Sequence, residues 1–183
     1  MHIRQLGLGA LIASLALSGA ASAKDQTYRA ELTRTAYGAP HVTAKDYGGL
    51  GYGAGYAAAE DNFCDFAERI MTVSGERSRY LGPGERDANI VSDLYHARLL
   101  KTGQLDAKLA GDVPGGFKPS KNARDLIKGF VAGINRYVSD TGIANLPDDR
   151  CKGAAWVRTY TERDYWQVMV VGQIPTLLPG VAT

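Results

Sequence analysis

Net charge, cysteine and histidine are all scarce in this sequence, and each scarcity narrows the possible functions. The 183 residues carry 21 lysines and arginines against 19 aspartates and glutamates, a formal net charge of +2. A chain so close to neutral is not expected to bind nucleic acid, which requires a strongly basic surface. The two cysteines, Cys64 and Cys151, form no Cys-x-x-Cys pair, and histidines are few. We therefore expect neither a zinc site nor any other metal or cofactor.

The sequence also has no apolar run that is long enough to predict a transmembrane helix. Its N-terminus instead carries Arg4, an apolar stretch at residues 6–17 and small residues at 21–23. This pattern is typical of a cleavable signal peptide. We expect residues 1–23 to be the signal and residues 24–183 to form one domain, periplasmic or secreted, without stable membrane insertion. The alternative is an N-terminal anchor that is never cleaved.

A recognisable catalytic centre is missing as well. There is no Gly-x-Ser-x-Gly motif, and His41 and His96 lie outside any nucleophile motif. The acidic pairs at residues 60–61 and 148–149 are more typical of a solvated surface than of catalysis. The predicted mature N-terminus, Lys24, cannot act as an N-terminal nucleophile, which requires serine, threonine or cysteine. We therefore expect no catalytic residue in this chain.

Export would allow the two cysteines to form a disulfide. A bridge between Cys64 and Cys151 would close a long loop and contribute roughly 4 kcal/mol in the chain-entropy model. The alternative is two separate buried thiols. We favour the bridge, because an exported chain without nearby metal ligands offers the cysteines little other use.

The first ordered element expected in the mature chain is a β-hairpin. Residues 28–35 alternate apolar and polar side chains, which predicts a strand. Residues 37–40, Tyr-Gly-Ala-Pro, favour a tight turn, and residues 41–44 predict a short returning strand. An isolated hairpin is not stable in water. We therefore expect it to extend a larger sheet, for which this chain offers few further strands.

A helix with a face of small residues follows the hairpin, from residue 46 to about residue 73. Gly48, Gly51, Gly55 and Ala59 are spaced by three and four, so they lie on one side of it. Residues 53–58 also match the loose Gly-x-Gly-x-x-Ala pattern of dinucleotide-binding loops. No apolar strand leads directly into that pattern, so we favour a surface for close helix packing, since mid-helix glycines are otherwise costly.

Apolar residues at helical spacing predict three further helices. They cover residues 89–100, a strongly amphipathic stretch after the N-cap Ser120, and residues 165–174 after a capping box at residues 161–164. In the first of them, the residues expected to point inward are Ile90, Leu94, Ala97 and Leu99 or Leu100. The last is apolar almost all round and is expected to be buried. Residues 74–84 are expected to form a loop.

Together these features resemble the α chain of the penicillin-acylase family of N-terminal-nucleophile hydrolases. The resemblance is carried by the order of a strand, the Tyr-Gly-x-Pro-His turn at residues 37–41, the glycine-rich helix and the Ala-Glu-Asp-Asn sequence at residues 59–62. The segment at residues 74–82 adds to it. The placement of Cys64 and Cys151 looks most like the acyl-homoserine lactone acylase branch of that family.

The resemblance implies a precursor that cuts itself into an α chain and a longer β chain, whose N-terminal serine is the nucleophile. The expected fold class is α+β: a mainly helical α subunit contributing a hairpin to an αββα sandwich that the β chain completes. The expected function is hydrolysis of the amide bond of N-acyl homoserine lactones, or of penicillin-type amides. The implied partners are the β chain, in an αβ heterodimer, and a small acyl amide substrate.

The same resemblance places the wall of the acyl pocket at Gly172, Ile174 and Leu178, near the end of the last helix. A glycine at residue 172 would leave room for long or bulky acyl groups. The alternative is that these three residues only pack the helix. No acid follows Asp164, so the calcium ligand of some family members is not expected here.

Two other interpretations remain open from the sequence. One is a secreted, disulfide-closed helical protein that binds a partner or has a structural role. The other is a fragment of a different hydrolase.

Overall fold

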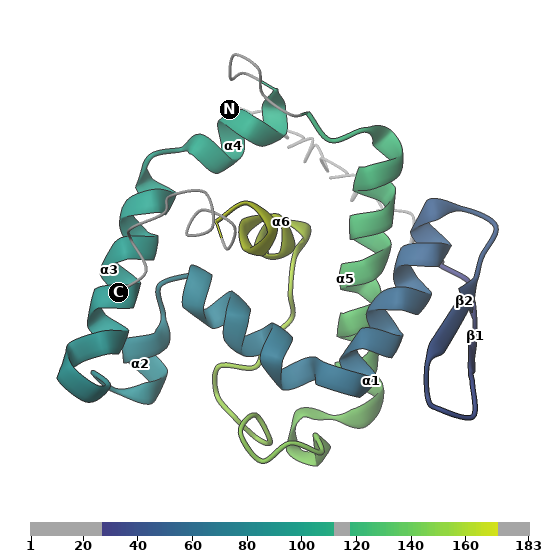
Figure 1. Ribbon diagram of the computed structural model, residues 1–183, viewed down its shortest axis with the longest axis horizontal. Helices are drawn as coiled ribbons and strands as arrows, with labels where there is room; N and C mark the ends of the chain where they lie inside the picture. The colour runs from purple at the N-terminus through teal and green to yellow at the C-terminus, as the bar shows by residue number, and fades with distance from the viewer. Residues whose placement is uncertain (1–26, 112–117, 172–183) are drawn as a thin grey trace, which may run out of the picture.

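The computed structural model describes residues 27–111 and 118–171, which form a mainly helical protein with one small sheet (Figure 1). The elements are β1 (Glu31–Arg34), β2 (Pro40–Thr43), α1 (Tyr47–Val73), α2 (Arg77–Leu81), η1 (Glu85–Asp87), α3 (Ala88–Lys101), α4 (Gln104–Ala110), α5 (Lys121–Thr141), η2 (Ile143–Asn145) and α6 (Glu162–Val171). Helices α1 and α5 cross at close range, and α6 packs against both. No helix in the described ranges is long and apolar enough to cross a membrane.

The predicted hairpin is present and lies beyond α1 (Figure 1). Strands β1 and β2 are antiparallel, with Leu32 opposite Val42, and the turn between them contains Gly38 at a φ of 82°. Each strand is 4 residues long, so β1 is shorter than the alternation at residues 28–35 predicted, whereas β2 has the predicted length. These are the only strands among the described residues. The mainly helical class with a small sheet is thus confirmed, while the αββα sandwich and its β chain stay predictions.

Helix α1 begins where the sequence predicted. The side chain of Asp46 accepts a hydrogen bond from the backbone N–H of Gly49 at 2.7 Å, which caps the helix. The helix runs for 27 residues and is kinked at Asn62, whose φ of −148° is not helical. The kink redirects the second half of α1 just before Cys64.

The glycine face of α1 packs directly on the backbone of α5. A Cβ atom added at Gly51 would overlap the carbonyl oxygen of Leu126, and one added at Gly55 would overlap that of Phe130. Helix α5 also carries glycines at this contact. A Cβ at Gly133 would overlap the carbonyl oxygen of Tyr52. The packing surface predicted for α1 is therefore confirmed, and no phosphate-binding loop is formed there.

A second set of glycines on α1 faces the hairpin. A Cβ at Gly53 would come within 2.8 Å of Ala30 and closer still to the side chain of Val42. A Cβ at Gly48 would meet the ring of Tyr28, while the carbonyl oxygen of Gly48 lies against Gly129 of α5. Small residues thus let α1 lie close to two neighbours at once, α5 on one side and the sheet on the other.

The inward face predicted for α3 is wrong at its first two positions, Ile90 and Leu94, whereas Ala97, Leu99 and Leu100 are half-buried. Leu94 is 67% exposed, Val91 is 62% exposed and Ile90 is also exposed. The buried side chain is Asp93, which accepts hydrogen bonds from the backbone N–H groups of Arg77 and Ser78 at 2.8 and 2.7 Å. Helical spacing shows that apolar residues share one side of α3, but it does not show whether that side faces the core.

The segment predicted as a loop at residues 74–84 contains the short helix α2. Asp93 accepts hydrogen bonds from the backbone N–H groups in the first turn of α2. Arg77 forms an ion pair with Glu68 at 3.0 Å. These contacts join α2 to both α1 and α3. The charges of this segment are paired, Arg77 with Glu68 and Arg79 with Glu76.

The main core lies between α1, α5, α6 and the loop before α6. Its largest fully buried side chains are Ile70, Ile134, Leu146 and Cys151. The prediction for α5 is confirmed, because its apolar stripe faces this core and Ser120 caps its first turn. The prediction that α6 is buried all round holds in part, since Met169 is 43% exposed.

Replacement of Gly133 by alanine tests the contact between α1 and α5. Alanine is favoured over glycine inside a helix by nearly 1 kcal/mol, so a stabilised protein would result if the helices had room. We expect instead that Gly133→Ala lowers the free energy of unfolding by roughly 1–3 kcal/mol, because the backbones must move apart. Urea denaturation of the purified protein measures the change.

The matched control is Ala58→Ser, which adds one heavy atom to an exposed position of α1. It should change the free energy of unfolding by less than about 0.5 kcal/mol. A Gly133→Ala variant as stable as this control would contradict the tight contact.

Candidate functional site

Helix α6 leads into the predicted acyl-pocket segment, so the contacts that hold it are the first candidates for a functional role. Its capping box is present: the N–H of Thr161 donates to Asp164 at 2.7 Å, and the N–H of Asp164 donates to the hydroxyl of Thr161 at 3.3 Å. Arg158 adds an ion pair to Asp164 at 2.6 Å. The start of α6 is thereby fixed in direction.

The pKa of Asp164 lies below its ordinary value of 3.8. Partial burial, the largest single influence, raises it, but the hydrogen bonds from Arg158 and Thr161 together outweigh burial. A carboxyl group with a lowered folded pKa stabilises the protein fully above its unfolded pKa, and the contribution is lost as the pH falls through the folded pKa. At neutral pH, therefore, the cap of α6 is in its charged, stabilising form.

Two amide side chains tie α6 and the segment before it to the main helices. Asn135 on α5 bonds the backbone of Tyr160 twice, donating at 2.8 Å and accepting at 2.9 Å. The buried Gln167 donates to the carbonyl oxygen of Val73, at the end of α1. Sequence analysis identified neither, because an amide inside a helical pattern does not indicate which distant backbone group it will meet.

Tyr160 lies deep in the core beside Phe63 and Phe66, with ring centroids 6.1 and 5.3 Å away. Burial raises its pKa to about 12, so the ring is neutral at physiological pH. Its hydroxyl makes no hydrogen bond within the described ranges. Tyr160 is thus a packing residue that places the chain entering α6.

The predicted pocket residues Gly172, Ile174 and Leu178 lie outside the described residues. Helix α6 ends at Val171, directly before them. The capping box, Asn135 and Gln167 therefore set the position from which the predicted pocket wall starts. The wall itself stays a prediction.

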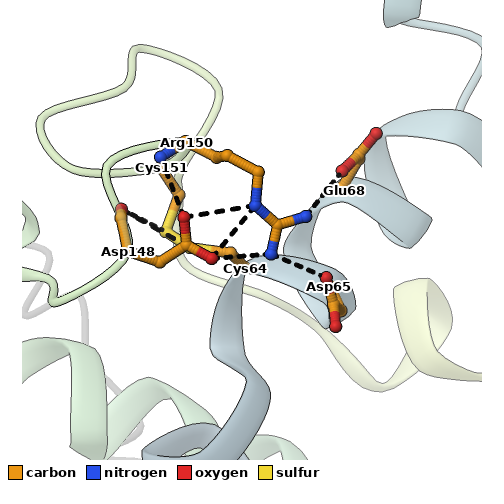
Figure 2. The surroundings of a disulfide bond; sticks show 6 residues. All are labelled: Cys64, Asp65, Glu68, Asp148, Arg150 and Cys151. Carbon is orange, nitrogen blue, oxygen red and sulfur yellow. Dashed lines mark hydrogen bonds and ion pairs between the residues drawn. A yellow bond between two sulfur atoms is a disulfide. The ribbon is translucent and has the colours of Figure 1, made fainter.

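The predicted disulfide is present between Cys64 and Cys151, whose Cα atoms lie 5.7 Å apart (Figure 2). Both cysteines are buried. The bridge joins α1, just beyond its kink at Asn62, to the loop between α5 and α6 across 87 residues of sequence. It therefore holds together the two chain segments that enclose the core.

Arg150 packs beside this disulfide and connects the same two segments by charge (Figure 2). Its guanidinium group forms ion pairs with Asp148 at 2.6 Å, with Asp65 at 2.8 Å and with Glu68 at 3.6 Å. The guanidinium holds the pKa of Asp148 below its usual range. Sequence analysis did not single out Arg150, although an arginine adjacent to a paired cysteine and two acids was an available signal.

The other candidates from the sequence do not come together. Glu60 and Asp61 bind Arg34 at 2.8 and 3.0 Å, and so fasten the hairpin to α1. His41 is exposed on β2, and His96 lies on α3, where its Nδ1 is 2.8 Å from the carbonyl oxygen of Ser92. No group of three histidines, cysteines or acids within the described ranges could hold a metal ion.

Removal of the disulfide tests its contribution to this arrangement. We expect the double variant Cys64→Ala with Cys151→Ala to lose about 4 kcal/mol of unfolding free energy, because the closed loop is long. Guanidinium denaturation measures the loss. A reducing agent should destabilise the wild type by a similar amount and leave the variant unchanged. Equal stability of variant and oxidised wild type would contradict the role given to the bridge.

Comparison with known proteins places these features in a family. The sequence model of the penicillin amidase family matches residues 29–174. The chain is 37% identical over 182 residues to aculeacin-A acylase of Actinoplanes utahensis, which covers 96% of this chain and 23% of that protein. It is also 37% identical over 163 residues to the acyl-homoserine lactone acylase PvdQ of Pseudomonas fluorescens strain Pf0-1, covering 87% of this chain and 20% of that protein.

A solved structure agrees with the sequence matches. A thermostable penicillin G acylase from Alcaligenes faecalis superposes with a TM-score of 0.69 at 26% identity, covering 86% of this chain and 78% of that chain. The chain spans about a fifth of the length of the two sequence relatives. Because the family match covers most of the residues, and relatives above 30% identity extend over nearly all of them, this chain belongs to the penicillin amidase family.

Proposed function

We propose that this chain is the α subunit of an exported acylase that hydrolyses the amide bond of N-acyl homoserine lactones or of related acyl amides. The observation that carries the proposal is the match to acylases along almost the whole chain but over only about a fifth of their length. Such a match fits one processed chain of a longer enzyme.

Three further observations support a second, larger chain. The penicillin G acylase chain that superposes on this one is of comparable length, because the aligned part makes up 86% of this chain and 78% of that one. The described sheet has only two strands, too few to be stable by itself. The described residues also bring together no nucleophile with a base. Each observation is what the α chain of a two-chain hydrolase would present.

In the proposed mechanism, the larger chain begins with a serine whose own α-amine acts as the base. The serine hydroxyl attacks the amide carbonyl, its proton passes to the amine, and backbone donors stabilise the oxyanion. The amine product leaves with the proton, and water then hydrolyses the acyl-enzyme. The α chain binds the acyl group at Gly172, Ile174 and Leu178 and holds that segment through α6.

The names of the relatives bear on the substrate. One is named for acyl-homoserine lactone, one for aculeacin A, and the structural neighbour for penicillin G. Most of the curated relatives found are acyl-homoserine lactone acylases. We therefore place acyl homoserine lactones first and other acyl amides second.

Native mass spectrometry of the full-length gene product, purified without denaturant, tests the two-chain proposal. We expect a complex of this chain and a larger one, and peptide sequencing should place serine at the larger chain's N-terminus. If this chain is instead isolated alone and monodisperse, the proposal is wrong. A helical binding or structural protein would then be the better interpretation.

Gly172→Leu tests the acyl pocket in the purified complex. A leucine there would fill the space left by glycine, so we expect hydrolysis of long and aromatic acyl amides to fall at least tenfold more than hydrolysis of short ones. Steady-state rates on a series of acyl chain lengths measure the split. The control is Met169→Leu, a volume-conserving change three residues earlier, which should preserve the chain-length profile. An equal loss on all substrates would contradict the pocket role.

A further inference from the structure

Helix α3 presents an apolar face to solvent. It consists of Ile90, Val91 and Leu94, which lie on one side of the helix and are all exposed. We propose that this face docks against the larger chain of the same acylase, on a surface with an apolar centre and carboxylates at one end. The inference rests on the proposed function and adds to it the place of contact on this chain.

The orientation of this face is fixed by contacts on the opposite side of α3. Asp93 is buried there and accepts hydrogen bonds from both the N–H and the hydroxyl of Ser78. Asn89 donates to the carbonyl oxygen of Gly82 at 3.0 Å and accepts from Arg77 at 2.9 Å. A rotation of α3 that brought its leucine and valine into the core would break these hydrogen bonds and leave the buried carboxylate without partners.

The polarity of α3 is therefore reversed relative to an ordinary surface helix. A carboxylate is buried, and three branched apolar side chains one turn or less apart point away from the core. Scattered exposed apolar residues are common, but a contiguous patch of large ones indicates an interaction site. Helix α3 also lies at the outer edge of the described structure (Figure 1), where a second chain can reach it.

Two basic side chains at the end of α3 indicate the charge expected on the partner surface. Arg98 and Lys101 follow Leu94 by one and two helical turns, so they continue the same stripe, and both are exposed. Neither forms an ion pair with another described residue. Carboxylates on the partner, placed near Arg98 and Lys101, would therefore stabilise a contact that covers Leu94.

The length of the relatives identifies the occupant. They are about five times as long as the stretch that matches them, so most of an acylase of this family must be accommodated around this chain. A second copy of this chain would account for none of that larger part. We therefore assign the face to the larger chain.

Photo-crosslinking in the full-length gene product tests the assignment. A benzophenone amino acid at residue 94 should crosslink to the larger chain, identified by mass spectrometry, at several times the yield obtained from residue 121. Lys121 is the control because it is highly exposed on another helix. Crosslinks to a second copy, no crosslink, or equal yields at both positions would overturn the assignment.

A charge variant provides a second test. Leu94→Glu should reduce copurification of the larger chain at least tenfold, whereas Leu94→Met, which keeps the apolar surface, should not. Circular dichroism of both variants establishes that the helices remain folded. If a larger chain copurifies equally with Leu94→Glu, this inference fails and the proposed function stands. If no larger chain exists in the wild type, both fail.

Discussion

The close contact between the backbones of α1 and α5 is the constraint on which the rest of the structure depends. Glycines on each helix face carbonyl groups of the other, so neither side tolerates a Cβ atom. Because α1 carries the hairpin on its other side and the disulfide beyond its kink, this contact fixes the positions of both. It also places Asn135 and the end of α1 where they hold α6 and the segment before it.

The functional consequence is a rigid frame that directs one segment. The disulfide and the ion pairs of Arg150 with α1 join parts of the chain that are distant in sequence, as do the hydrogen bonds of Asn135 and Gln167. The capping box and Arg158 fix the start of α6 locally. None of these groups is arranged as a catalytic centre. In the proposed acylase the chain therefore contributes position and pocket shape, whereas the chemistry belongs to the larger chain.

Much of this arrangement could be predicted, because most of the signals were local. The spacing of small residues on α1 and the capping box at Thr161 are read within short stretches. The pairing of Cys64 with Cys151 is not local, and it was favoured because the sequence holds just two cysteines. The orientation of α3 could not be predicted, since the same spacing fits a buried or a docked stripe and the polar partners of Asp93 come from a segment expected to be a loop. The glycines of α5 were also missed, because the strong apolar stripe beside them already accounted for that helix.

A double-mutant cycle on Gly55→Ala and Gly133→Ala tests the central contact most directly. If the two glycines hold the same pair of backbones together, the first alanine already separates the helices and the second costs little more. We therefore expect the loss of unfolding free energy in the double variant to be smaller than the sum of the two single losses by at least about 1 kcal/mol. Losses that simply add, within about 0.5 kcal/mol, would show that the two sites are independent and would contradict it.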